Sequence, residues 1–460
     1  MSIKSVVVCC CPSLIRPLID RVEASPLGYR LARGAFWSMT GGVIARGLGL
    51  IASILVARML GKSGFGELGI IQSTVGMFGT FAGFGLGLTA TKFIAEYRTV
   101  DPEKAGRIRG LSNGFAWITG GITALILFFM APWLAVHTLA APDLKGLLQV
   151  GSLLLLLTAV SGVQMGILSG FESFKTVAKI SLWTGLASFP LMVAGVYLAG
   201  LSGAVWAMVL AMGLNWFFNH VAIRSECNKA DVPYAYGQSW KEVTVLWRFA
   251  LPAMISGMFI TLSDWALTAM LVNEPGGYGQ MGLFNAARQW HVLILYVPLS
   301  ISNMTLPILS NLLGEGNRRQ YNKLVMVTSL LLTGLAFGAA LPVALFSTNI
   351  MRAYGHDFIQ GERVLLLVCF YSCWWAANIV IGQVLWSTGS SGLAMILAAA
   401  RAVILLGSFL LVTPKNACGI ALAYTITYVL MTAYQGILSA RSVDKSFLSR
   451  SQALQPIEQP

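Results

Sequence analysis

The stretch Ala57-Arg58-Met59-Leu60-Gly61-Lys62-Ser63-Gly64-Phe65-Gly66-Glu67-Leu68-Gly69 is a glycine-rich turn between two long apolar segments. A partial echo, Gly277-Tyr278-Gly279-Gln280-Met281-Gly282, returns in the second half of the chain. Its three glycines have the same spacing as Gly64, Gly66 and Gly69, and an aromatic residue again separates the first two. Because glycine is common in this chain (48 of 460 residues), the match gains its weight from its position, which is between the first and second apolar segments of each half. The pattern predicts two related halves.

The composition indicates a membrane protein. Hydrophobic residues make up 56% of the chain, charged residues 11%, and the mean hydropathy is +0.72, whereas soluble domains contain about 25% charged residues. Apolar runs of roughly 20 residues are long enough to cross a bilayer as helices, and they lack the alternation of barrel strands. We therefore predict an all-α polytopic membrane protein.

Twelve apolar segments are expected to span the membrane, six in each half. They lie at about 34–57, 66–90, 111–136, 147–168, 180–199, 201–221, 249–272, 283–313, 324–346, 364–386, 393–412 and 419–438. The predicted organisation is a cytoplasmic N-terminal arm (1–33), an N-lobe (34–222), a cytoplasmic inter-lobe linker (223–248), a C-lobe (249–438) and a cytoplasmic tail (439–460).

Lysine and arginine are distributed unevenly between the two sets of connecting loops. With the N-terminus in the cytoplasm, inner segments hold 22 of the 31 basic residues and outer loops hold six. Because basic loops resist transfer across the membrane, we predict that both termini are cytoplasmic. Topology and attraction to anionic lipid headgroups account for most of the net charge of +13, so membrane lipids rather than nucleic acid are the expected partner of the basic loops.

The N-terminal apolar run does not predict a signal peptide, and the cysteines do not predict a metal site. The apolar run beside Cys9, Cys10 and Cys11 is shorter than a signal-peptide core, and we place it in the N-terminal arm. Cys369 and Cys373 share a helix face, but two thiols without further ligands make a poor metal site. No metal or other cofactor is expected.

The connecting loops give little support to an enzyme. His356, Asp357 and Glu362 lie in the longest outer loop, where three hydrated polar residues are more often solvated than catalytic. The sequence contains no GxxxxGK[ST] nucleotide-binding loop, which disfavours an ATP-driven pump. We therefore assign no catalytic residue and expect a transporter.

Five Arg, Asp or His side chains lie well inside the predicted spans, away from the span ends, where a charge is costly unless it faces water or a partner. Arg46 and Arg401 lie near the middle of the first and eleventh spans. Asp264 and His291 lie at matching depth in spans seven and eight, and Arg288 shares a helix face with His291. Polar stripes on two consecutive helices predict a hydrated cleft. Arg46, Arg288 and Arg401 are the candidates for substrate binding, and Asp264 and His291 are the candidates for coupling or gating.

The role of Asp264 stays open at this point. Asp264 and Arg288 could form a structural ion pair that holds their two helices together. Arg46 and Arg401 have no acidic residue in their own spans. An uncompensated cationic interior suits an anionic substrate, and the planar guanidinium group matches phosphate well.

The first hundred residues resemble a known family. The motifs are Arg33-Gly34-Ala35-Phe36-Trp37-Ser38, Ala45-Arg46-Gly47-Leu48-Gly49, the opening of the glycine turn at Ala57–Gly61 with Phe65-Gly66 and Leu68-Gly69, Gly83-Phe84-Gly85-Leu86-Gly87, and Thr91-Lys92-Phe93-Ile94-Ala95-Glu96-Tyr97. They resemble bacterial polysaccharide flippases of the Wzx type, which belong to the multidrug/oligosaccharidyl-lipid/polysaccharide (MOP) exporter superfamily.

The resemblance implies two six-helix lobes in a V around a central cavity that opens alternately to either side of the bacterial inner membrane. It implies a substrate made of a sugar repeat unit (O-antigen, capsule or exopolysaccharide) on undecaprenyl pyrophosphate. It gives Arg46 a substrate-contact role, because relatives that flip the peptidoglycan precursor have an arginine in a similar stretch. Those relatives also have a following acidic residue and two additional helices that are missing here, so the peptidoglycan precursor is the less expected cargo. A polysaccharide polymerase and a chain-length regulator are the further partners that the resemblance implies.

Two alternatives compete with the flippase. A cation-coupled drug antiporter of the same superfamily would carry acidic residues in the membrane, whereas arginines here outnumber the single central aspartate, Asp264. A membrane glycan polymerase or transferase would need larger catalytic loops than this chain has.

Overall fold

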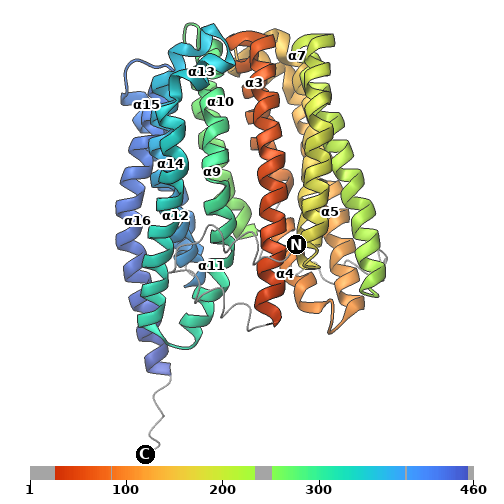
Figure 1. The fold of residues 1–460 in the computed structure, drawn as a ribbon, viewed down its shortest axis with the longest axis vertical. Coiled ribbons are helices and arrows are strands. Elements are labelled where there is room, and N and C mark those ends of the chain that lie inside the picture. Colours follow the sequence, from red (N-terminus) through yellow and green to blue (C-terminus); the bar gives the residue numbers. More distant parts are fainter. Residues whose placement is uncertain (1–25, 84, 234–250, 389–390, 454–460) are drawn as a thin grey trace, which may run out of the picture.

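The computed structural model describes residues 26–83, 85–233, 251–388 and 391–453, which are almost entirely helical (Figure 1). The first half contains α3 (Pro26–Gly83), α4 (Leu86–Tyr97), α5 (Pro102–Trp133), η1 (Leu134–Thr138), η2 (Pro142–Leu144), α6 (Lys145–Gly170) and α7 (Phe174–Lys229). The second half contains α9 (Leu251–Val272), α10 (Gly277–Ile294), α11 (Tyr296–Gly314), α12 (Arg318–Leu345), α13 (Ser347–Tyr354), η5 (His356–Gly361), α14 (Glu362–Ser387), α15 (Ser391–Leu411) and α16 (Ala417–Ala453).

Nine helices in the described ranges are long and apolar enough to cross a membrane. This finding confirms the expected all-α, multi-pass membrane protein. Two of the nine, α3 and α7, are interrupted by sharp kinks at Gly61 (φ 69°) and Gly200 (φ 56°). These glycines adopt left-handed backbone angles that residues with a Cβ rarely tolerate, so each of the two helices consists of two limbs.

Three helix ends differ from the expected boundaries. Helix α3 begins at Pro26, inside the expected N-terminal arm, α7 continues to Lys229, inside the expected linker, and α16 continues to Ala453, inside the expected tail. A helix need not end where its apolar segment ends, because its backbone hydrogen bonds persist into the aqueous flank. Cys9, Cys10, Cys11 and most of the expected linker lie outside the described residues.

Helix α3 lies between the two halves of the chain. In Figure 1, α5 and α7 lie to one side of α3, and α12, α14 and α16 lie to the other. Helix α3 contacts α5, α6 and α7 of its own half and α9, α10 and α13 of the second half. This central helix carries both the opening glycine turn and Arg46.

The two glycine turns detected in the sequence pack against each other. A Cβ added at Gly66 would collide with the Tyr278 carbonyl oxygen, and one added at Gly282 would collide with the Lys62 carbonyl oxygen. Their backbones approach so closely that only glycine fits at either position. The repeated motif is therefore a contact between the two halves.

Segments that were expected on the same side of the membrane meet at this end of the molecule. Tyr278 donates a hydrogen bond to the Leu139 carbonyl (2.6 Å), and Asn273 donates one to the Thr138 carbonyl (2.7 Å). Burial, with a contribution from nearby Glu67, raises the pKa of Tyr278 above its ordinary value, so the hydroxyl keeps the proton that it donates. These two bonds join the expected outer loop around Leu139 to the one around Tyr278, and the glycine contact adds the loop at Lys62, so three expected outer segments form one closed end.

Candidate functional site

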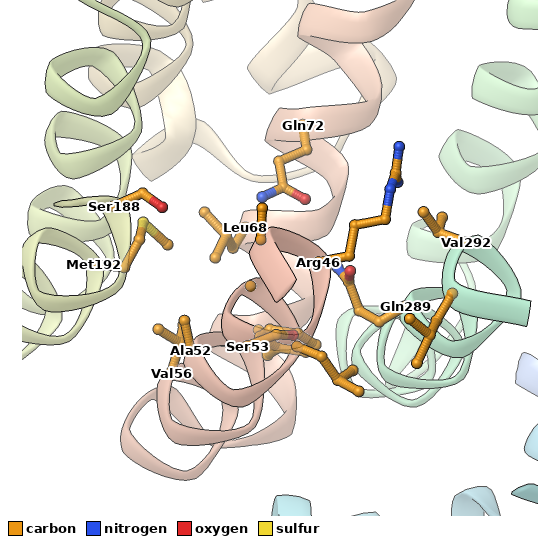
Figure 2. A pocket seen from close by; sticks show the side chains of 15 residues that line it. Arg46, Ala52, Ser53, Val56, Leu68, Gln72, Ser188, Met192, Gln289 and Val292 are labelled. Atoms are coloured by element: carbon orange, nitrogen blue, oxygen red, sulfur yellow. The ribbon is translucent and has the colours of Figure 1, made fainter. Parts of the chain in front are cut away.

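A cavity of about 350 Å³ opens between the two limbs of α3, helix α7 and helix α10 (Figure 2). Ser188 and Met192 form its α7 wall, and Gln289 and Val292 form its α10 wall. We call this space the Arg46 cavity, since Arg46 is its charged lining residue. It lies between the halves, as expected for a central transport path.

The side chain of Arg46 is exposed in this cavity. Figure 2 shows it extending between Gln72 and Val292. Its guanidinium carbon lies 4.3 Å from the centre of the Tyr296 ring, which is a cation–π contact. Tyr296 can approach because Gly42, one turn before Arg46, has no Cβ that would collide with its hydroxyl. Within the described part of the chain, Arg46 has no acidic partner within 4 Å.

A second cavity, of about 290 Å³, adjoins the first and contains Arg288 and Asp264. The two cavities share the lining residues Gln72, Gln289 and Val292, so they form one continuous space. We call it the Arg288 cavity. The polar stripes expected on two consecutive helices therefore do face a common cavity, since Thr261 and Asn285 also line it.

The expected Asp264–Arg288 ion pair is wrong, because Asp264 is paired with Arg401 instead (2.9 Å). Arg401 also donates to the hydroxyls of Ser263 (3.3 Å) and Tyr428 (3.0 Å), and its side chain is only 8% exposed. Arg401 is thus compensated in charge, contrary to the expectation from its own span. Arg288 is half-buried and forms no ion pair or hydrogen bond with any described residue.

The cavity consequently carries two cations, Arg46 and Arg288, that have no acidic partner in the part of the chain that the structure describes. Its acidic residue, Asp264, is neutralised by Arg401, which is not among the residues that line either cavity. The remaining polar lining consists of amides and hydroxyls, which can exchange hydrogen bonds with a hydroxyl-rich ligand. Chemically, this arrangement suits an anion that carries polar, uncharged substituents.

His291 lies outside the lining of both cavities. Its Nδ1 is 2.8 Å from the Ser372 hydroxyl, which itself donates to the Val368 carbonyl, so His291 is the donor to Ser372. The imidazole packs against Tyr371 (4.9 Å between ring centres), and Tyr371 stacks on Tyr428 (6.1 Å). Because Tyr428 binds Arg401, an aromatic column connects His291 to the Asp264–Arg401 pair.

Sequence reasoning missed four residues of the site: Gln72, Gln289, Tyr296 and Tyr428. Gln72 precedes Ser73, Gln289 follows Arg288, and an amide side chain within a predicted span was the available signal. Tyr296 and Tyr428 gave no signal, because an aromatic residue in a membrane helix is ordinary. Across the described residues, no group of three or more His, Cys, Asp or Glu side chains could hold a metal ion.

Residues 31–313 match the family described as "Polysaccharide biosynthesis protein". The chain is similar to the EPS I polysaccharide export inner membrane protein EpsE of Ralstonia nicotianae, at 23% identity over 66% of this chain and 67% of that one. It is also similar to the lipid III flippase of Escherichia coli, at 21% identity over 61% of this chain and 68% of that one.

A solved structure shows the same fold. An inward-facing multidrug resistance MATE family transporter of the MOP superfamily superposes with a TM-score of 0.72, covering 90% of this chain and 98% of that one. The sequence identity is 14%, so this likeness concerns the fold alone.

Proposed function

Because the chain belongs to the polysaccharide biosynthesis protein family, we propose that it is a flippase that moves an undecaprenyl-pyrophosphate-linked oligosaccharide across the bacterial inner membrane. The cargo in this proposal is an O-antigen, capsule or exopolysaccharide repeat unit. The resemblance to polysaccharide flippases of the MOP superfamily is confirmed by the family match and the shared fold. The relatives named as a polysaccharide export protein and a lipid III flippase support a lipid-linked glycan as the substrate class.

The observation that carries the proposal is a pair of arginines, Arg46 and Arg288, that lack acidic partners among the described residues. A pyrophosphate carries several negative charges, and arginine binds phosphate oxygens with two parallel hydrogen bonds. Arg46 and Arg288 line adjoining cavities, so one ligand can reach both. The neighbouring amides of Gln72 and Gln289 suit the first sugar of the repeat unit.

Alternating access between two six-helix lobes is part of the proposal. The kinks at Gly61 and Gly200 divide two of the nine candidate spans into two limbs each, which gives eleven, and α10 with α11 over the expected eighth span would be the twelfth. The closed end formed by the two glycine turns supports a cavity that is open toward the opposite side. We place both termini in the cytoplasm on the basis of the distribution of basic residues.

A cation-coupled drug antiporter is the second candidate, and the MATE fold favours it. Its cationic substrates would need an acidic cavity, whereas Asp264 is already neutralised by Arg401. The relatives are named as an export protein and a flippase, which favours a transporter over a glycan polymerase or transferase. The polysaccharide polymerase and the chain-length regulator stay predicted partners.

Translocation of a fluorescent lipid-linked oligosaccharide in proteoliposomes tests the function. Wild-type protein should move the lipid to the opposite leaflet. Arg46→Ala and Arg288→Ala should each lower the rate by about tenfold or more, because each variant loses a charge-assisted hydrogen bond to the pyrophosphate. Ethidium efflux by the same vesicles is the control for the antiporter. Ethidium transport without lipid translocation would contradict the flippase.

Asp264 and His291 keep their proposed coupling role, which the same vesicles test under an imposed pH gradient. The aromatic column gives a route by which a change at His291 reaches the Asp264–Arg401 pair. We expect His291→Ala to change the pH dependence of translocation while Ser439→Ala, remote from the column, does not. An unchanged pH profile would leave the pair as packing only.

A further inference from the structure

A third cavity, of about 700 Å³, extends along the first half of the chain. Its walls come from α3, α4, α6 and the second limb of α7, with Met254 of α9 at one side. We call it the glycine groove, after the glycines that line it: Gly76, Gly79, Gly83, Gly85, Gly87 and Gly162. Its volume lies within the range of about 300–1,000 Å³ that is usual for cavities holding a small ligand.

The surface of the glycine groove is hydrocarbon in character. Two of its polar side chains, Thr80 and Thr158, donate their hydroxyl hydrogens to carbonyls of their own helices, those of Gly76 (3.4 Å) and Leu154 (2.7 Å). Met208, Met212 and Met254 contribute thioethers, which adapt to irregular apolar shapes. Among the described residues, no charged side chain lines this groove, unlike the two arginine cavities.

The glycines make notches in the groove. A Cβ added at Gly76, Gly83 or Gly162 would meet no heavy atom within 4 Å. No side chain fills the space beside these three glycines. A branched ligand can therefore place its branches directly against the helix backbone there. A polyprenyl chain carries a methyl branch on every isoprene unit, whereas an ordinary acyl chain has none.

The glycine groove joins the arginine cavities. Gln72 lines all three spaces, and Gly76 lines both the groove and the Arg288 cavity. The Gln72 amide lies at the junction and donates to the Met208 sulfur (3.4 Å). An amphiphile with its anionic head between Arg46 and Arg288 would therefore find an apolar channel directly behind that head.

We propose that the glycine groove binds the isoprene units next to the pyrophosphate of a polyprenyl carrier. This inference rests on the proposed function, and it assigns the recognition of the lipid chain to the first half of the protein. The groove holds only the first few isoprene units, and the rest of the chain stays in the bilayer. Recognition then depends on head and chain together.

Competition for binding to the purified full-length protein in detergent tests this proposal. The probes are inorganic pyrophosphate, farnesyl pyrophosphate, which has three isoprene units, and dodecyl pyrophosphate, which has an unbranched chain. We expect farnesyl pyrophosphate to bind more tightly than inorganic pyrophosphate by at least about tenfold, from burial of its chain, and more tightly than dodecyl pyrophosphate.

Two variants fill the groove from opposite walls: Gly162→Leu on α6 and Gly83→Leu on α3. Both should reduce the affinity for farnesyl pyrophosphate to near that of inorganic pyrophosphate, whose own affinity should not change. Gly338→Leu is the matched control, because a Cβ on this exposed α12 glycine also meets nothing within 4 Å and the residue lines none of the three cavities. Retained pyrophosphate binding shows that each variant is folded.

The outcomes separate this inference from the proposed function. If none of the three probes binds, the pyrophosphate site itself is wrong. The glycine groove is not the chain site if farnesyl pyrophosphate binds no more tightly than inorganic pyrophosphate. The same conclusion follows if farnesyl pyrophosphate still binds more tightly than inorganic pyrophosphate in both groove variants. Equal binding of dodecyl and farnesyl pyrophosphate would assign the groove to a general acyl chain and overturn the isoprenoid assignment.

Discussion

Arg46 and Arg401 are arginines in the interior of membrane helices, and their surroundings are opposite. Arg401 is buried, with Asp264, Ser263 and Tyr428 around its guanidinium group. Arg46 is exposed in a cavity, with an aromatic ring as its described contact. We infer that an intramembrane arginine is available to a ligand only when the protein supplies no counter-charge for it.

Arg288 belongs with Arg46 in this comparison. Both line the continuous cavity, and neither has an acidic partner among the residues that the structure describes. Arg401 lies behind Asp264 and neutralises it. We therefore expect the cluster around Arg401 to serve mainly the stability of the fold, and Arg46 and Arg288 to be the arginines that bind an anion.

The largest effect on stability is expected at the buried pair. Arg401→Ala leaves Asp264 without its partner and should lower the free energy of unfolding by about 3–5 kcal/mol. Denaturant unfolding of the purified protein measures the loss. The exchange variant, Asp264→Arg with Arg401→Asp, keeps the pair neutral and should recover most of the stability. Wild-type stability in Arg401→Ala would show that the pair does not hold α9 to α15.

Sequence predicted the class of fold, because the apolar runs and the repeated glycine turn are local patterns. The packing of Gly66 against Tyr278 explains why glycine recurs in both turns, since a Cβ there would collide with the backbone of the other turn. Sequence also found Arg46, Arg288, Asp264 and the cleft that they line. The partner of Asp264 could not be predicted in this way, since Arg288 and Arg401 are both arginines within spans. Only the packing of α9 against α15 brings Arg401 to Asp264.

A smaller effect on stability is expected at Arg46. Replacing it with alanine removes an exposed cation–π contact with Tyr296, which is worth about 0.5–1 kcal/mol. Denaturant unfolding should therefore place Arg46→Ala within about 1 kcal/mol of the wild type and well above Arg401→Ala. A loss at Arg46 as large as that at Arg401 would remove the distinction between the two arginines.

Binding of inorganic pyrophosphate to the purified protein, measured by isothermal titration calorimetry, tests most directly whether the unpaired arginines form the anion site. The wild type should bind, and Arg46→Ala and Arg288→Ala should each weaken binding by about tenfold or more, since each removes a charge-assisted contact. Arg46→Lys should recover part of the affinity, because lysine keeps the charge and loses the planar fork. Unchanged affinity in Arg46→Ala and Arg288→Ala would contradict the assignment.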